Sequence, residues 1–179
     1  GDDRPISNKV GTAAADVYLV FDPLEAAKDK NLQHATPNRT VAVVSMSEFA
    51  TGDMVRSTNL SFPQMQFLKR SIDNRTQPER NVYLDAKALS ENVFGSHMQA
   101  NMICIGAAYQ VGVLPLDAAT LEHTITINGV AVKANLLAFR IGRKLVADPD
   151  WHPLKQLKRD GDLDIQPEVS PASRTLIDT

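Results

Sequence analysis

The chain alternates short apolar runs with helix-forming segments, and this alternation limits what it can fold into. Apolar runs at 16–21 and 40–45, and a shorter one at 81–85, are each bounded by polar or proline residues. Such runs are typical of strands that are buried on both faces. Helical stretches are predicted between them, at 24–34 and 63–72. Strands that alternate with helices form a parallel sheet, so the sequence predicts a three-layer α/β domain with a short parallel sheet.

A C-terminal helical cluster is predicted after the sheet. Ser96 begins a capping-box pattern, and the helix that follows is expected to end at Gly112. Asp117 is expected to cap a second helix, and Asn128 to head a third. Gly106 lies inside the first of these helices, where glycine costs about 1 kcal/mol relative to alanine. We therefore expect another backbone to approach closely at Gly106.

Composition limits the class of protein. The 179 residues are 43% hydrophobic and 22% charged, as in an ordinary globular domain with its own core. A net charge of −2 gives no attraction to nucleic acid, and no apolar run is long enough for a membrane-spanning helix. We expect neither nucleic acid nor membrane as a partner. The single cysteine, Cys104, cannot form a disulfide within one chain or ligate an iron–sulfur cluster, and it favours a cytoplasmic location.

The domain organisation is expected to have three parts. Residues 1–15 are interpreted as an N-terminal extension and 16–150 as the folded domain. After Trp151 the composition becomes charged, rich in proline and poor in large apolar residues. We interpret 151–179 as a polar linker or tail.

Two candidate ligand-binding residues lie where predicted strands end. Ligands of parallel sheets bind outside the carboxyl ends of the strands, and Asp22 and Ser45 occupy such positions. Asp85 follows the third strand in the same way. Asp22 precedes Pro23 and Asp85 precedes a helix, so both also fit helix N-caps, and the two readings stay open.

Three asparagines are further candidates for ligand binding: Asn101, Asn128 and Asn135. Asn101 and Asn135 look buried inside predicted helices, where asparagine is unfavourable. Each is expected either to bond a neighbouring loop or helix end, or to contact a ligand. Arg140 and Arg143 could pair with anionic groups or complement a helix dipole. No catalytic residue and no metal site is expected, since the four histidines lack metal-ligand spacing.

Residues 96–143 resemble one enzyme family. They read SHMQANMICIGAAYQVGVLPLDAATLEHTITINGVAVKANLLAFRIGR, which is similar to the run NLxLLGAAYQxGxLPLSxxxIExAIxLNGVAVxxNLxAFRxGR. That run is a hallmark of the gamma domain of 2-oxoacid:ferredoxin oxidoreductases, and the nearest match is indolepyruvate ferredoxin oxidoreductase. The matching positions include Asn101, Gly106, Tyr109, Gln110, Asn128, Gly129, Asn135, Phe139, Arg140, Gly142 and Arg143. The segments ADVYLVFDPLEAA, NLQHATPNRTVAVVS, TGDMV and NVYLDAKAL extend the resemblance over roughly residues 5–148.

The resemblance implies a Rossmann-like fold and a place in an enzyme that converts an aryl 2-oxoacid to an acyl-CoA while reducing ferredoxin. The family uses thiamine pyrophosphate, magnesium, iron–sulfur clusters and coenzyme A, and we expect none of these cofactors in this chain. The family's GxGGxG loop does not occur before Asp16. We therefore expect a C-terminal portion of the gamma domain, inactive alone, with other domains or subunits of the oxidoreductase as partners. The alternative is a free-standing, non-catalytic binding or interaction module that kept the gamma fold.

A homo-oligomer is also expected. A sheet of about three parallel strands leaves an edge unpaired, and a second copy could cover that edge or the apolar surface beside it. Val20→Lys or Val43→Lys is expected to probe such a contact. The competing expectation is a monomer in which the tail or the first fifteen residues cover the edge.

Overall fold

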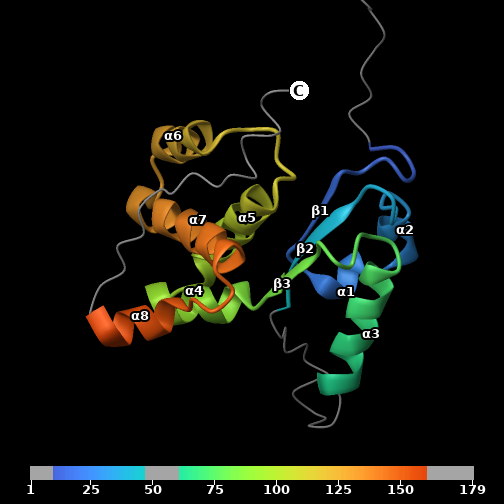
Figure 1. Cartoon of the computed structure of the whole chain (residues 1–179), viewed down its shortest axis with the longest axis horizontal. Helices are drawn as coiled ribbons and strands as arrows, with labels where there is room; N and C mark the ends of the chain where they lie inside the picture. The colour runs from blue at the N-terminus through green and yellow to red at the C-terminus, as the bar shows by residue number, and fades with distance from the viewer. Residues whose placement is uncertain (1–9, 47–60, 161–179) are drawn as a thin grey trace, which may run out of the picture.

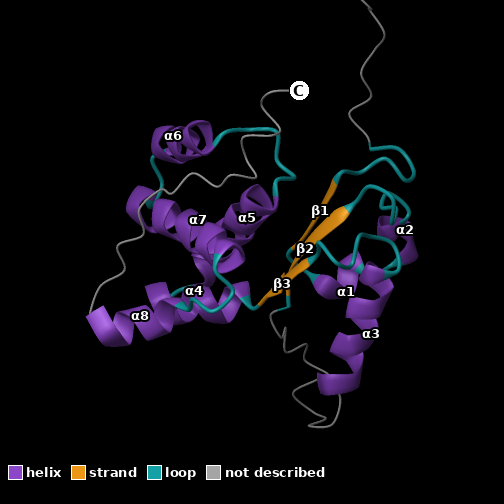
Figure 2. Cartoon of the chain, in the orientation of Figure 1, coloured by secondary structure: helices purple, strands orange, loops and turns teal. Residues whose placement is uncertain are grey.

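The computed structural model describes residues 10–46 and 61–160, and the side chains of 10–46 and 65–157. A small sheet lies in the middle, with α1, α2 and α3 on one face and the later helices on the other (Figures 1 and 2). Most of the described residues are helical (Figure 2). The predicted three-layer α/β fold, with a short parallel sheet followed by a helical cluster, is confirmed.

Three parallel strands form the sheet in the order β1 (Val17–Val20), β2 (Val41–Ser45) and β3 (Val82–Leu84). β2 is buried along its whole length, whereas β1 and β3 are mostly half-buried. β2 has a strand on each side and helices on each face, which explains its unbroken apolar sequence.

Side chains alternate between the two faces of the sheet. One face packs on the helical cluster and contributes Leu19, Val43, Val82 and Leu84. The other face contributes Val20, Ala42 and Val44 and packs on α1 (Pro23–Ala26), α2 (Asp29–Leu32) and α3 (Ser61–Asp73). Val20 and Val43 are 2% and 0% exposed. The expectation that lysine at these positions would probe a sheet-edge contact is therefore wrong, because both side chains lie in the core.

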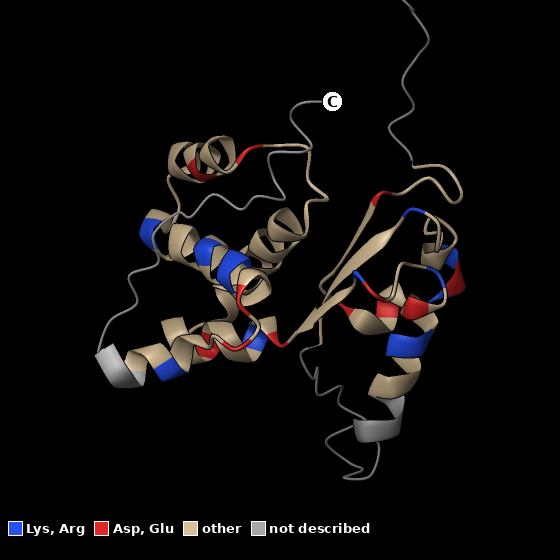
Figure 3. Ribbon diagram, viewed as in Figure 1, with Lys and Arg blue, Asp and Glu red and all other residues tan. Residues whose placement is uncertain are grey.

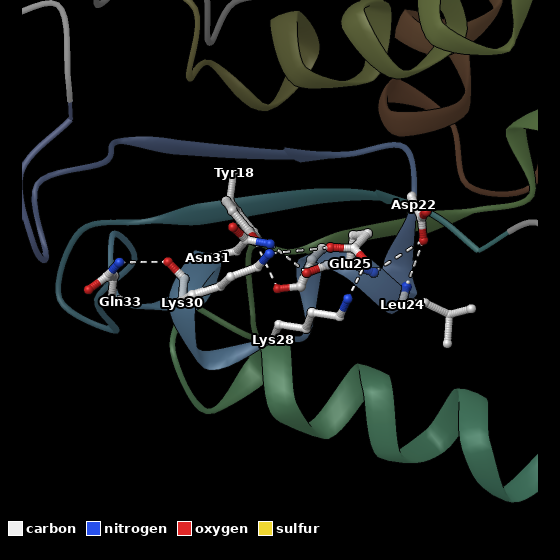
Figure 4. Close-up of polar contacts among 9 residues, drawn as sticks. Tyr18, Asp22, Leu24, Glu25, Lys28, Lys30, Asn31 and Gln33 are labelled. Carbon is white, nitrogen blue, oxygen red and sulfur yellow. Dashed lines mark hydrogen bonds and ion pairs between the residues drawn. The ribbon is translucent and has the colours of Figure 1, made fainter.

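The single helix expected at 24–34 is two short helices, α1 and α2. The Tyr18 hydroxyl donates a hydrogen bond to the Ala26 carbonyl at 2.8 Å, and Asn31 Nδ2 donates to the Glu25 carbonyl at 2.7 Å (Figure 4). These side chains satisfy carbonyls at the end of α1 that a continuous helix would have used. The chain can therefore turn between Ala26 and Asp29 without leaving those acceptors unbonded.

Helices follow β3: α4 (Ala86–Phe94), the 3-10 helix η2 (His97–Gln99), α5 (Ala100–Val111), α6 (Ala118–Asn128), α7 (Val132–Ala147) and α8 (Pro153–Asp160). Gly112 ends α5 and Asp117 caps α6, as expected. Asn128 ends α6 and does not head α7, so that expectation is wrong. Gly129, at φ 72°, is the left-handed residue that ends α6, and it places Asn128 before the turn.

Ser96 caps η2, not α5 directly; its side chain accepts a hydrogen bond from the Met98 N–H.

α8 lies within the segment interpreted from sequence as a linker or tail. Pro153 is buried, and Leu157 packs against the main core cluster beside α4. Residues 1–9 of the expected extension and 161–179 of the expected tail lie outside the described residues.

α5 and α7 cross at two glycines. A Cβ atom added to Gly106 would lie 2.0 Å from the Phe139 carbonyl oxygen, and one added to Gly142 would lie 1.9 Å from the Ile103 carbonyl oxygen. The contacts run in opposite order along the two helices, so the helices are antiparallel. The close approach expected at Gly106 is confirmed, and Gly142 is its counterpart on α7.

We expect Gly106→Ala and Gly142→Ala each to lower the free energy of unfolding by about 1 to 3 kcal/mol or more. The clash is with a helix carbonyl, which cannot rotate aside as a side chain can. It should outweigh the gain of about 1 kcal/mol in helix propensity that alanine brings. Urea denaturation measures the effect.

Gly11→Ala is the matched control, because its Cβ atom would meet the Ala14 Cβ at 3.7 Å, an ordinary contact. A Gly142→Ala variant as stable as this control would contradict the close crossing.

Candidate functional site

Three polar residues lie at the carboxyl edge of the sheet. Ser45 is the last residue of β2, Asp85 directly follows β3, and Asp22 lies two residues after β1. The register pairs Val20 with Val44 and Ser45 with Leu84, so the strands end together. Neighbouring strands lie about 4.8 Å apart. The predicted grouping of Asp22 and Ser45 at one edge is therefore present in the fold.

Both aspartates at this edge cap helices. Asp22 Oδ1 accepts hydrogen bonds from the N–H groups of Leu24, at 3.0 Å, and Glu25, at 3.2 Å (Figure 4). Asp85 Oδ1 accepts one from the Ala88 N–H at 2.9 Å. Each carboxylate satisfies N–H groups that the first helical turn leaves unpaired. The N-cap reading is confirmed for both, and ligand contact by Asp22 stays a prediction.

Ser45 is buried, at 4% exposure. The next residue extends the pairing with β3, because the Met46 N–H donates to the Leu84 carbonyl at 2.9 Å. Residues 47–60 follow and lie outside the described residues, as does the TGDMV segment of the resemblance. The described part of this edge therefore ends at Met46, and ligand contact by Ser45 stays a prediction.

The candidate asparagines lie in two separate places. Asn101 is in the first turn of α5, whereas Asn128 and Asn135 flank the turn between α6 and α7. Asn101 precedes Gly106 by five residues, and Asn135 precedes Phe139 by four on the antiparallel helix. At a rise of 1.5 Å per residue this separates Asn101 from Asn135 by roughly 13 Å along the helix axes. The structure does not bring the three together.

Only one of the two asparagines expected to be buried is even half-buried. Asn101 is exposed, so that expectation is wrong for it. Asn135 is half-buried, and its Nδ2 donates to the Val130 carbonyl at 2.9 Å. This bond spans the turn in which Ala131 has φ 43°, a left-handed conformation that is uncommon for alanine. The loop-bonding alternative is thus confirmed for Asn135.

The two arginines of α7 connect it to its neighbours. Arg140 donates from Nε and Nη2 to the two carboxylate oxygens of Glu122 on α6, at 2.9 and 2.8 Å. Arg143 is 5% exposed, and its guanidinium carbon lies 5.1 Å from the ring centre of Tyr109 on α5. Its Nε also donates to Gln110 Oε1 at 3.5 Å. Pairing with a carboxylate is confirmed for Arg140.

A polar cluster that sequence reasoning missed joins α3 to the sheet. Asp73 accepts hydrogen bonds from the Tyr83 hydroxyl at 2.6 Å, from Asn81 Nδ2 at 2.8 Å and from Lys69 Nζ at 2.5 Å. Asn81 Oδ1 in turn accepts from the Ala42 N–H of β2 at 2.8 Å. The Lys69 to Asp73 spacing of four residues is the one sequence signal that could have indicated it.

Ionisation of this cluster is set by burial and hydrogen bonding. Burial opposes the charge on Asp73, but the hydrogen bonds from Lys69, Tyr83 and Asn81 outweigh it and lower the pKa of Asp73. Burial, together with the bond to the Asp73 carboxylate, raises the pKa of Tyr83. The cluster lies at the amino end of β3, away from the edge where ligands of parallel sheets bind, so its role is to fix α3 on the sheet.

Cys104 is fully buried, and burial raises the pKa of its thiol to about 12. It therefore behaves as a small apolar side chain of the core, as expected. Within 10–46 and 61–160, no cluster of three or more His, Cys, Asp or Glu side chains is arranged to hold a metal ion. No helix of the same residues has the length and apolar character that crossing a membrane requires.

Comparison with known proteins gives one match. A family model described as pyruvate ferredoxin/flavodoxin oxidoreductase matches residues 2–145. No curated protein and no solved structure matches the chain significantly. The matched residues include the three strands, the carboxyl edge of the sheet and the crossing of α5 with α7.

We expect the stability contributed by Asp73 to depend on pH. Its pKa is lower in the folded than in the unfolded chain, so its charge stabilises the fold at neutral pH. That contribution should decrease as the pH falls from the unfolded-state pKa of about 4 through the lower folded-state value. Asp73→Asn should therefore be less stable than the parent chain at pH 7, by about 1 to 3 kcal/mol, and the difference should shrink on acidification.

Urea denaturation at a series of pH values measures this difference. Asp150→Asn, at an exposed position after α7, is the control and should match the parent chain at pH 7. A difference for Asp73→Asn that is the same at every pH would contradict the expected role of its charge.

Proposed function

Because the chain belongs to the pyruvate ferredoxin/flavodoxin oxidoreductase family, we propose that it is the C-terminal portion of the gamma domain of an indolepyruvate ferredoxin oxidoreductase. Such an enzyme oxidatively decarboxylates an aryl 2-oxoacid to an acyl-CoA and passes the electrons to ferredoxin. The observation that carries the narrower assignment is the run at 96–143, which resembles the gamma domain of that enzyme from Asn101 to Arg143.

The position of the matching residues supports a non-catalytic role. Gly106 and Gly142 are points where the backbones of α5 and α7 meet, and Phe139, whose carbonyl lies against Gly106, is fully buried. Arg140 is paired with Glu122. The run thus specifies how helices pack, and it contributes structural support to the rest of the enzyme, in which we place the reacting groups.

The residues of this chain decide which of the family's cofactors it could hold. An iron–sulfur cluster needs several cysteine thiolates, and the one cysteine, Cys104, is buried with a raised thiol pKa, so these residues do not fit a cluster. Other domains or subunits would hold the clusters, thiamine pyrophosphate and magnesium. The unpaired cysteine also suits a reducing, cytoplasmic setting.

We propose that this chain alone binds none of the family's cofactors, and that in the whole enzyme it lies beside coenzyme A. Asp22 and Asp85 already occupy the N-termini of α1 and α4 with negative charge, which disfavours phosphate there. We place hydroxyl or amide groups of coenzyme A at the carboxyl edge of the sheet, beside Asp22 and Ser45. Asn101 lies roughly 13 Å from Asn135 along the helix axes, so we propose that at most one of these two places contacts the groups bound at this edge.

We expect the purified chain to give no reduction of viologen with indolepyruvate and coenzyme A. The full reading frame that encodes it should give coenzyme A-dependent reduction, with a higher kcat/KM for indolepyruvate than for pyruvate. Activity of the chain alone would contradict the non-catalytic role.

The substrate assignment has its own contradicting result. Preference of the full enzyme for pyruvate would refute the indolepyruvate assignment and leave the family assignment in place. A reading frame that encodes no thiamine-binding domain would favour the free-standing module.

A further inference from the structure

Asn128 is the only asparagine in the sequence that is followed by glycine. Glycine has no side chain, so its backbone is less hindered than that of any other residue. Its nitrogen can therefore approach the side-chain amide of the residue before it. The other asparagines are all followed by residues whose side chains obstruct that approach. Asn128 and Gly129 thus form the one pair in which a backbone nitrogen meets little hindrance at an asparagine amide.

The structure leaves both partners of this pair accessible. Asn128 and Gly129 are exposed, and the Asn128 side chain forms no hydrogen bond with the described residues. The nearby Asn135 differs, because its amide is held by the Val130 carbonyl at 2.9 Å. A Cβ atom added to Gly129 would meet the Ile127 carbonyl oxygen only at 3.8 Å, an ordinary contact. The turn therefore has room for the amide to move toward the Gly129 nitrogen.

The end of α6 is also weakly held. The helix packs on one side only, and Ile125 is its one buried residue, whereas Ile127 is 72% exposed. Figure 1 shows α6 at the margin of the helical cluster, on the side away from the sheet. The Gly129 N–H donates to the Thr126 carbonyl at 3.2 Å, the long end of the usual range. Helix ends fray, so this last turn can open and release the Gly129 nitrogen.

We propose that Asn128 is a site of spontaneous deamidation in the folded chain. The Gly129 nitrogen forms a bond to the side-chain carbonyl carbon of Asn128, and the bond from that carbon to Nδ2 breaks. The proton of the Gly129 N–H passes to the leaving nitrogen, which departs as ammonia and leaves a cyclic succinimide. Water then opens either carbonyl of the ring, which gives aspartate or isoaspartate. Water is the only co-reactant, and nothing is oxidised or reduced.

Either product changes the end of α6. A negative charge appears at the carboxyl end of the helix, where the helix dipole is already negative. Residues 124–132 carry no charged side chain, and Figure 3 shows few charged residues on α6, in contrast to α7. Isoaspartate also lengthens the backbone just before Gly129, the left-handed residue that ends the helix. Deamidation should therefore loosen the turn between α6 and α7. The proposal does not rest on the proposed function.

Peptide mapping by mass spectrometry, after incubation of the folded chain at pH 8, tests the site. The peptide that contains Asn128 should be replaced by aspartate and isoaspartate forms, which chromatography separates. Asn74 and Asn101 are internal controls, because both are exposed but precede Arg75 and Met102. Both should stay unmodified while Asn128 converts. Hydroxylamine, which reacts with succinimides, should trap the intermediate at residue 128.

Asn128→Gln is the matched variant, because glutamine keeps the amide but would have to close a larger, less favourable ring. It should lose the conversion at residue 128. Circular dichroism checks that the chain stays folded during the incubation, and a sample in urea shows that the mapping detects the products. Two results would overturn the proposal. One is conversion of Asn128 in urea but not in the folded chain, and the other is conversion no faster than that of Asn74 and Asn101.

Discussion

The crossing of α5 with α7 at Gly106 and Gly142 is the contact on which the helical half of the molecule depends. Each glycine lies against a carbonyl of the other helix, so the two backbones touch over about one helical turn. α5 in turn lies on β1 and β2, and α7 carries α6. The sheet therefore holds α5, α5 holds α7, and α7 holds α6. A side chain at either glycine would force α5 and α7 apart.

Small residues make this arrangement possible, and polar contacts then fix its orientation. Cys104, Ala107 and Ala108 of α5 and Ala138 of α7 are fully buried in one core cluster. Arg143 covers the aromatic ring of Tyr109, and Arg140 joins α7 to α6. On the opposite face of the sheet, the Asp73 cluster has the same role for α3. The side chains with the most polar contacts thus hold layers together, in agreement with a supporting role in a larger enzyme.

Local signals were enough to predict the strands and some of the helix ends. Unbroken apolar runs revealed β1 and β2, and Gly112 and Asp117 marked helix boundaries because glycine and aspartate have specific capping geometries. The division of α1 from α2 could not be predicted, since it depends on Tyr18 from a neighbouring strand. The sequence pattern predicts Asn128 at the start of the next helix, but Gly129 is a left-handed cap that ends α6 directly after it. α8 has a polar composition, and only its packing through Pro153 and Leu157 explains its presence.

The candidate site was predicted in part for the same reason. The carboxyl ends of parallel strands lie at the same edge, so the topology alone predicts that Asp22 and Ser45 are grouped there, independently of their side-chain contacts. The separation of Asn101 from Asn135 follows from the antiparallel crossing, which sequence spacing does not reveal. The partners of Asp73 lie four, eight and ten residues away in sequence. Lys69 shares its helix, but Asn81 and Tyr83 meet Asp73 only because the chain turns back from α3 into β3, which sequence spacing does not reveal.

Native-state hydrogen exchange at increasing denaturant tests most directly whether the glycine crossing holds the helical cluster to the sheet. Amides of Ile103 to Tyr109 and of Ala138 to Gly142 should exchange only by global unfolding, together with those of β2. Those of α6, which packs on one side only, should exchange by smaller openings. Exchange of the α5 and α7 amides at lower denaturant than the β2 amides would show that the helices open independently, and would contradict the account.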